Sequence, residues 1–144
     1  MADYRSIALL DLDDAIFTYE NKRYRTAVFH FHQFAEKSAK ALLVKKYPEH
    51  KLLKSHAVEK ILESYDEAHT TSEIGDKARY LTGFYFNTRY PGDNFTEITE
   101  AQAKKAKQLC EELEKYFVSE LEMLIKTSNN VALELDSFPT LEIT

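Results

Sequence analysis

The sequence predicts an all-α protein, an up-and-down bundle of about five helices that ends in a short C-terminal tail. The 144 residues include only 3 glycines and 3 prolines but 30% charged side chains, and so few helix breakers favour long helices. Apolar residues recur at three- and four-residue spacings, the period of a helix with one buried face. A chain of this length suits one domain, which we place at residues 1–126, with 127–144 as the tail.

The first two predicted helices cover about residues 3–20 and 23–46. The first has a stripe of four residues, Ala8, Leu12, Ala15 and Tyr19. Asp11 falls on the same side, where it either has a partner or sits at a solvated edge, because an unpaired buried charge is costly. The second helix has the strongest periodicity in the chain and aromatic residues on two sides. We therefore expect it to lie centrally in the bundle or to pack in a dimer.

Polar segments with capping residues introduce the third and fourth predicted helices, at about 56–68 and 73–89. Ser55 is the expected N-cap of the third, and Thr70–Glu73 has the spacing of a capping box that opens the fourth. Gly83 lies in the middle of the fourth helix, where glycine costs up to about 1 kcal/mol relative to alanine. A close helix crossing would explain this glycine.

The fifth predicted helix covers about residues 100–126 and opens with a second capping box, Thr99–Gln102. Cys110 falls within its apolar stripe, so we predict a small core residue rather than a nucleophile. Apolar and polar residues then alternate over 131–136, which indicates either a short strand or an unanchored tail.

Charge and composition limit the class of protein. The net charge is −5, and the acidic excess belongs to residues 111–144. No apolar run approaches the roughly 18 residues that span a bilayer, and the first residues lack the basic start and apolar stretch of a signal peptide. The single cysteine permits no internal disulfide. We therefore expect a soluble cytoplasmic protein with no membrane association.

The segment from Tyr85 to Gly92 is the most informative stretch for function. Arg89 lies near the predicted end of the fourth helix, where the helix dipole favours a cation and a guanidinium offers several donors to an anion. Tyr85, Tyr90 and Arg89 could stack on a base and hold a phosphate. Alternatively the tyrosines pack in the fold, and Arg89 pairs with an acid such as Asp11 or Glu36.

Four further residues are candidates for ligand binding: Glu36, Lys37, Lys40 and His56. Glu36 and Lys40 make a favourable i,i+4 pair on the polar side of the second helix. Glu36 and Lys37 either line a polar groove or are solvated, and a dimer packed along the second and fourth helices would bring them near Arg89. His56 either donates to a phosphate or is a structural residue in the region of a helix cap.

The sequence offers little for a metal or a cofactor. His30 and His32 are two residues apart and point in different directions on a helix, so they form no chelating pair. The other histidines have no zinc-type spacing and no cysteine partners. The three glycines are isolated, so there is no glycine-rich phosphate loop. We expect neither a metal nor a cofactor.

Four segments, in their order and spacing, resemble the HEPN family, small helical domains named for higher eukaryotes and prokaryotes and for nucleotide binding. These segments span about residues 4–126 and are Asp11-Leu12 with Ala15, Ala27 to Leu42 with its Glu-Lys and Lys-Ala-Leu steps, Ser55-His56, and Arg89-Tyr90-Pro91-Gly92 before a Thr-capped final helix. The resemblance implies a helical bundle that is usually dimeric. It also implies either a metal-independent ribonuclease, often a toxin, or a partner of a small nucleotidyltransferase.

The chain departs from the ribonuclease pattern, in which an arginine is followed after four to six residues by a histidine. The corresponding positions after Arg89 hold Asn94, Phe95 and Thr96. No histidine follows His69, and the spaced pair Arg25 and His30 lies at the start of the second helix, away from the family's pair. We therefore predict a dimeric binding module without catalytic residues, which partners a nucleotidyltransferase or binds a nucleotide or RNA. The alternatives are a toxin-like ribonuclease with a degenerate site and a purely structural interaction domain.

Overall fold

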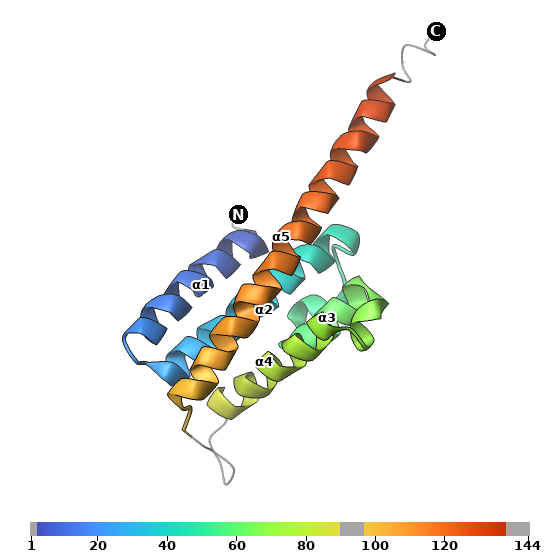
Figure 1. Cartoon of the computed structure of the whole chain (residues 1–144). Coiled ribbons are helices and arrows are strands. Elements are labelled where there is room, and N and C mark those ends of the chain that lie inside the picture. Colours follow the sequence, from blue (N-terminus) through green and yellow to red (C-terminus); the bar gives the residue numbers. More distant parts are fainter. Residues whose placement is uncertain (1–2, 90–96, 138–144) are drawn as a thin grey trace.

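The computed structural model describes residues 3–89 and 97–137, with side chains at 3–84 and 97–129. This part of the chain contains five α-helices: α1 (Tyr4–Glu20), α2 (Tyr24–Lys46), α3 (Val58–Tyr65), α4 (Glu73–Arg89) and α5 (Glu100–Ser137). Two short 3-10 helices flank α3, namely η1 (Lys51–Lys54) and η2 (Glu67–Thr70). The predicted all-α bundle is confirmed (Figure 1).

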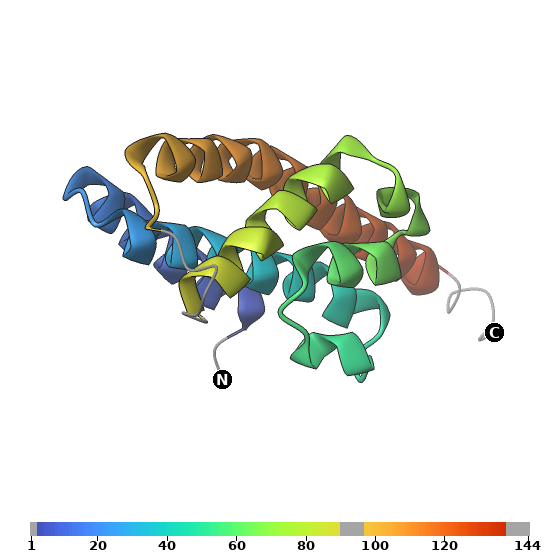
Figure 2. The same ribbon diagram turned by 90° about the horizontal axis from the view of Figure 1, so that it is seen from below.

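Helix α2 lies at the centre of the bundle and contacts each of the four other α-helices. Figure 1 shows α1 on one side of α2 and α3 and α4 on the other, with α5 crossing in front. The helices α1 and α2 run in opposite directions, as do α4 and α5, and Figure 2 shows the same arrangement from below. The central position explains why aromatic residues occur on two sides of α2.

The core consists of α2 and the faces of the neighbouring helices that pack against it. Phe34 of α2 is buried edge-on against Phe117 of α5, with ring centroids 5.9 Å apart. Cys110 of α5 is buried in the same core, as its place in the apolar stripe predicts, and its Sγ lies 3.4 Å from the carbonyl oxygen of Phe31. Burial of a large apolar side chain contributes roughly 1.5–3 kcal/mol, so this α2–α5 contact is a major source of stability.

Two predicted helix caps are wrong. The N-cap of α3 is Ala57 rather than Ser55, whose Oγ instead accepts a hydrogen bond from the Ala57 N–H at 3.0 Å. The predicted box over 70–73 does not open α4, because the capping oxygen belongs to Ser72 and accepts from the Gly75 N–H at 3.0 Å. At both helices, several hydroxyl residues or a short helical turn precede the first helical residue. Residue spacing alone therefore does not identify which residue is the N-cap.

The two described glycines of α4 have opposite surroundings. A Cβ added at Gly83 would meet no described atom within 4 Å, so the predicted close helix crossing at this residue is wrong. A Cβ added at Gly75 would lie 1.9 Å from the carbonyl oxygen of His69. The close approach that requires a glycine is therefore at the start of α4, where the chain turns out of η2.

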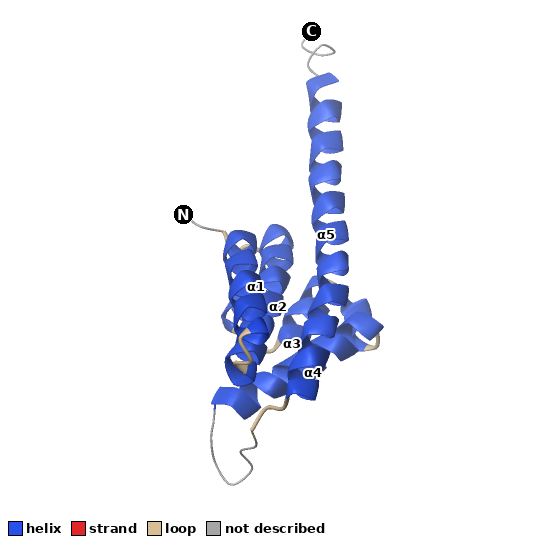
Figure 3. Cartoon of the chain, turned by 60° about the vertical axis from the view of Figure 1, so that its left-hand side comes forward, coloured by secondary structure: helices blue, strands red, loops and turns tan. Residues whose placement is uncertain are grey.

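Helix α5 begins as predicted but is longer. The Thr99 N–H donates to Gln102 Oε1 at 2.9 Å and the Gln102 N–H donates to Thr99 Oγ1 at 3.2 Å, which confirms the capping box. The helix was expected to end near residue 126, with a strand or tail over 131–136, but it continues to Ser137. Figure 3 shows its C-terminal part extending beyond the other helices. None of the described helices is both long and apolar enough to cross a membrane.

Candidate functional site

A connected group of polar side chains runs along α2 and joins it to α1 and to the segment before α3. We call this group the α2 polar strip, and its members are Asp11, His30, Gln33, Glu36, Lys37, Lys40 and His56. Spacings of three and four residues place the α2 members on neighbouring positions of one helix surface. The local sequence of α2 therefore determines which α2 residues lie together in the strip. The contacts of these residues with Asp11 and His56 depend on how the neighbouring segments pack against α2.

Asp11 connects α1 to the first half of the strip. Its Oδ1 lies 3.1 Å from His30 Nδ1, and its Oδ2 accepts a hydrogen bond from Lys37 Nζ at 3.1 Å. Of the two predicted alternatives for this acid, the structure shows the one with partners. Lys37 Nζ also donates to Gln33 Oε1 at 3.2 Å, and this amide links Asp11 to the second half of the strip.

Glu36 is the buried centre of the second half. Its Oε2 accepts from Lys40 Nζ and its Oε1 from His56 Nδ1, both at 3.0 Å, while Gln33 Nε2 donates to Oε1 at 3.4 Å. Burial by itself raises the pKa of this carboxyl, but the hydrogen bonds from Lys40 and His56 outweigh burial and hold the pKa below its usual value. Glu36 is therefore a carboxylate at neutral pH.

His32 supports the strip from within the core. Its ring is buried, and this burial lowers its pKa to about 4, so the imidazole is neutral at pH 7. Nε2 lies 2.8 Å from the carbonyl oxygen of His56, and Nδ1 lies 3.2 Å from Gln33 Nε2. A neutral ring with its proton on Nε2 donates to the carbonyl and accepts from the amide, which fits both contacts. His32 thus holds the backbone of His56 against α2.

The carboxylates of the strip are less exposed than its outer nitrogen-bearing side chains. The Glu36 side chain is 3% exposed and that of Asp11 is 14% exposed, whereas Lys37 is 25% and His56 is 54% exposed. Asp11 fixes Lys37 and Glu36 fixes His56, each by a hydrogen bond. A ligand that approaches from solvent therefore meets positioned nitrogen donors before it meets carboxylate oxygens.

The structure brings together part of the predicted site. Three predicted residues, Glu36, Lys40 and His56, are in direct hydrogen-bond contact. Lys37 joins them through Gln33, which sequence reasoning missed although it precedes Glu36 by three residues and Lys37 by four. Arg89 is the last residue of α4, as predicted, but its side chain, that of Tyr85 and all of Tyr90 lie outside the described residues. Their role stays a prediction.

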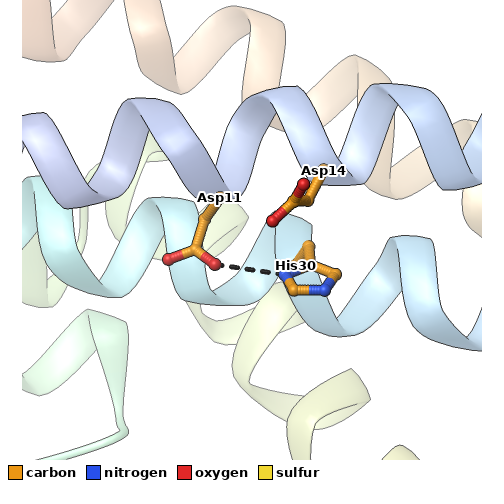
Figure 4. Close-up of side chains that lie close together, drawn as sticks. All are labelled: Asp11, Asp14 and His30. Atoms are coloured by element: carbon orange, nitrogen blue, oxygen red, sulfur yellow. Dashed lines mark hydrogen bonds and ion pairs between the residues drawn. The ribbon is translucent and has the colours of Figure 1, made fainter.

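Two members of the strip, Asp11 and His30, also form a group with Asp14 of α1. Asp11 and Asp14 of α1 and His30 of α2 each offer a ligand atom, and these atoms all lie within 4.8 Å of one another. Figure 4 shows the two carboxylates and the imidazole converging between the two helices. No metal-ligating spacing in the sequence indicates this group, because its members come from two helices and combine two acids with one histidine.

Residues 1–121 match the family model of the HEPN domain. This chain belongs to the HEPN family. The match covers α1 to α4 and α5 as far as Leu121, and membership supports a nucleotide- or RNA-related module in general. No curated protein and no solved structure matches the chain.

Of the spaced pair Arg25 and His30 at the start of α2, His30 takes Asp11 as its partner, with its side chain half-buried between α1 and α2. Arg25 is exposed at the first turn of α2. The HEPN bundle therefore holds His30 as part of the α2 polar strip.

Proposed function

We propose that this HEPN domain is a dimeric, non-catalytic binding module that holds a nucleotide or an RNA end on the α2 polar strip, together with Arg89, and partners a small nucleotidyltransferase. One observation carries the ligand part of this proposal: the strip presents Lys37 and His56 toward solvent above the partly buried carboxylate of Asp11 and the buried carboxylate of Glu36. Phosphate oxygens accept hydrogen bonds from such donors, and a donor whose position is already fixed loses less entropy on binding.

The absence of catalysis is inferred from the histidines. The sequence has no histidine after His69, so none follows Arg89 at the ribonuclease spacing. His69 Nε2 lies 2.6 Å from the Tyr116 hydroxyl and its Nδ1 lies 2.7 Å from Ser72 Oγ, which makes it a structural link between η2, α4 and α5. His32 is neutral and buried. These rings serve the fold rather than proton transfer.

The pair of Glu36 and His56 favours a metal-independent ribonuclease as the second candidate. A buried carboxylate that bonds Nδ1 of a half-exposed histidine fixes the ring orientation, which is an arrangement used by general bases. The binding module and the ribonuclease differ in whether they cleave RNA. Prolonged incubation of RNA with the chain and a chelator should leave the RNA intact under the leading proposal, and cleavage that His56→Ala abolishes would favour the second.

Binding is tested by titrating the full chain with mononucleotides and short RNAs at two salt concentrations. We expect Lys37→Ala, His56→Ala and Arg89→Ala each to weaken binding about tenfold, because each removes a charge-assisted hydrogen bond to phosphate. Lys104→Ala is the matched control, since this lysine is exposed on α5, a helix that contributes no member of the strip. Binding that is absent, or that weakens equally in the control, contradicts the ligand proposal.

The partner part has its own test. Light scattering of the purified chain should give the mass of a dimer, and co-expression with a small nucleotidyltransferase should yield a complex that survives gel filtration. A monomeric mass at micromolar concentration contradicts the dimer, and separate elution of the two proteins contradicts the partnership. Neither result bears on whether the α2 polar strip binds a nucleotide.

A further inference from the structure

We propose that Asp11, Asp14 and His30 form a binding site for a divalent transition-metal ion between α1 and α2. Asp11 and His30 also belong to the α2 polar strip, but the metal site needs neither Arg89 nor the Glu36 half of the strip, so its test does not depend on nucleotide binding. Its donors are two carboxylate oxygens and one imidazole nitrogen from two antiparallel helices, and they lie within 4.8 Å of one another (Figure 4).

Local sequence and packing bring the three donors together. Asp11 and Asp14 are three residues apart on α1, so they lie on one face of that helix, one turn apart. His30 is on α2, which packs along α1, and its ring is half-buried between the helices. Helix bundles also bind metal ions with acids and histidines on neighbouring helices, although those ligands face the bundle core, whereas Asp14 is exposed.

The distances require little rearrangement. Metal–ligand bonds of about 2.0–2.2 Å place neighbouring ligand atoms about 3 Å apart. Asp11 Oδ1 and His30 Nδ1 are already 3.1 Å apart. Asp14 is exposed, and no hydrogen bond or ion pair to a described residue restrains its carboxylate, so a rotation of this side chain can complete the site.

Charge also favours a cation. Asp11 and Asp14 contribute two negative charges, and Lys37 contributes one positive charge through its hydrogen bond to Asp11 Oδ2. These two acids and this lysine together carry one net negative charge. Because Lys37 bonds Oδ2 and His30 faces Oδ1, Asp11 offers a single oxygen to the metal and keeps its bond to the lysine, which orients the ligand.

The donor set selects the class of metal. Imidazole nitrogen together with carboxylate oxygen suits zinc and manganese-type ions, whereas magnesium and calcium prefer sites made of oxygen alone. Three protein ligands also leave at least one coordination position for water or another ligand. We therefore expect Zn²⁺ and Mn²⁺ to bind more tightly than Mg²⁺.

The test measures the melting temperature and the binding isotherm of the chelator-treated full chain with Zn²⁺, Mn²⁺ or Mg²⁺ alone. Zn²⁺ or Mn²⁺ should raise the melting temperature of the parent chain, because a ligand that binds only the folded state stabilises it. Asp14→Asn and His30→Gln should each weaken binding about tenfold or more, as expected when a ligand or its orientation is lost.

Asp13→Asn is the matched control, since Asp13 is an exposed neighbour on α1 outside the group. It should bind metal like the parent chain. No binding by the parent chain overturns the site, as does binding that persists unchanged in Asp14→Asn. Because Asp14 is exposed, that variant keeps the proposal falsifiable even if His30→Gln fails to fold.

Discussion

His56 Nδ1 and Glu36 Oε1 lie 3.0 Å apart, and this bond joins a half-exposed imidazole to a carboxylate that is almost completely buried. The same carboxylate bonds the buried Lys40 one turn along α2. Glu36 is thus shared between a group that faces solvent and a group that belongs to the core. Any change at Glu36 is expected to alter both surface recognition and stability.

Removal of the Glu36 carboxylate should be strongly destabilising. Glu36→Ala leaves the Lys40 ammonium, which is 8% exposed, without its partner, and breaking a buried pair in this way costs about 3–5 kcal/mol. Glu111→Ala is the control, because Glu111 forms an exposed i,i+4 pair with Lys107 and should cost about 0.5 kcal/mol or less. Urea unfolding measures both free energies. Equal losses of the free energy of unfolding would show that the buried Glu36–Lys40 pair stabilises the fold no more than the exposed pair.

Stability should fall as the pH drops from about 6.5 to about 4, through His32. In the unfolded chain His32 takes up a proton near its usual pKa of about 6.5, whereas burial keeps it neutral in the folded protein down to about 4. The unfolded state therefore binds more protons in this window, which lowers the free energy of unfolding by about 3 kcal/mol at its acidic end.

The measurement for His32 is the free energy of unfolding as a function of pH. His32→Gln removes the titrating ring, so its stability curve should be flatter than that of the parent chain between these two pH values. Above pH 7 the two curves should run parallel, because His32 is neutral in both states there. Identical slopes below pH 6.5 would mean that His32 titrates normally in the fold.

The two glycines of α4 should respond to alanine in opposite directions. Gly75→Ala drives a methyl group into the carbonyl oxygen of His69 and is expected to cost about 2 kcal/mol or more. Gly83→Ala adds a methyl group in open space within a helix and should stabilise the fold by about 0.5–1 kcal/mol. Thermal unfolding of the two single variants measures the change in stability relative to the parent chain. A destabilised Gly83→Ala variant would mean that a further part of the molecule lies close to Gly83.

Cys110 should resist thiol reagents in the folded protein. Its side chain is buried and burial raises its pKa well above the ordinary value, so almost no thiolate is present or accessible. Labelling with Ellman's reagent should be slow in buffer and complete in denaturant. Rapid labelling of the native chain would show that α5 opens readily from the bundle.

Sequence periodicity predicted the fold because each helix carries its own apolar stripe and most of its boundary signals. The box at Thr99 and the core position of Cys110 follow from residues within one helix, and both are confirmed. The extension of α5 was not predicted, because the polar residues at 127–130 indicate a helix break. None of these residues excludes a helix, however.

The candidate site was only partly predictable. The pair of Glu36 and Lys40 follows from its i,i+4 spacing. The bonds from Asp11 to His30 and Lys37 depend on how α1 lies along α2, and no local pattern specifies that register. The same is true of Asp14, which the sequence marks only as a polar position three residues after Asp11.

The position of α2 has a consequence for unfolding. Every other described α-helix makes its most extensive contact with α2, so detaching a single neighbour exposes part of the α2 surface. Loss of α2 would remove this main contact from each of them, although α3 and α4 also pack on each other. Partially unfolded forms that keep only some helices are therefore poorly stabilised, and the domain should melt in one cooperative step.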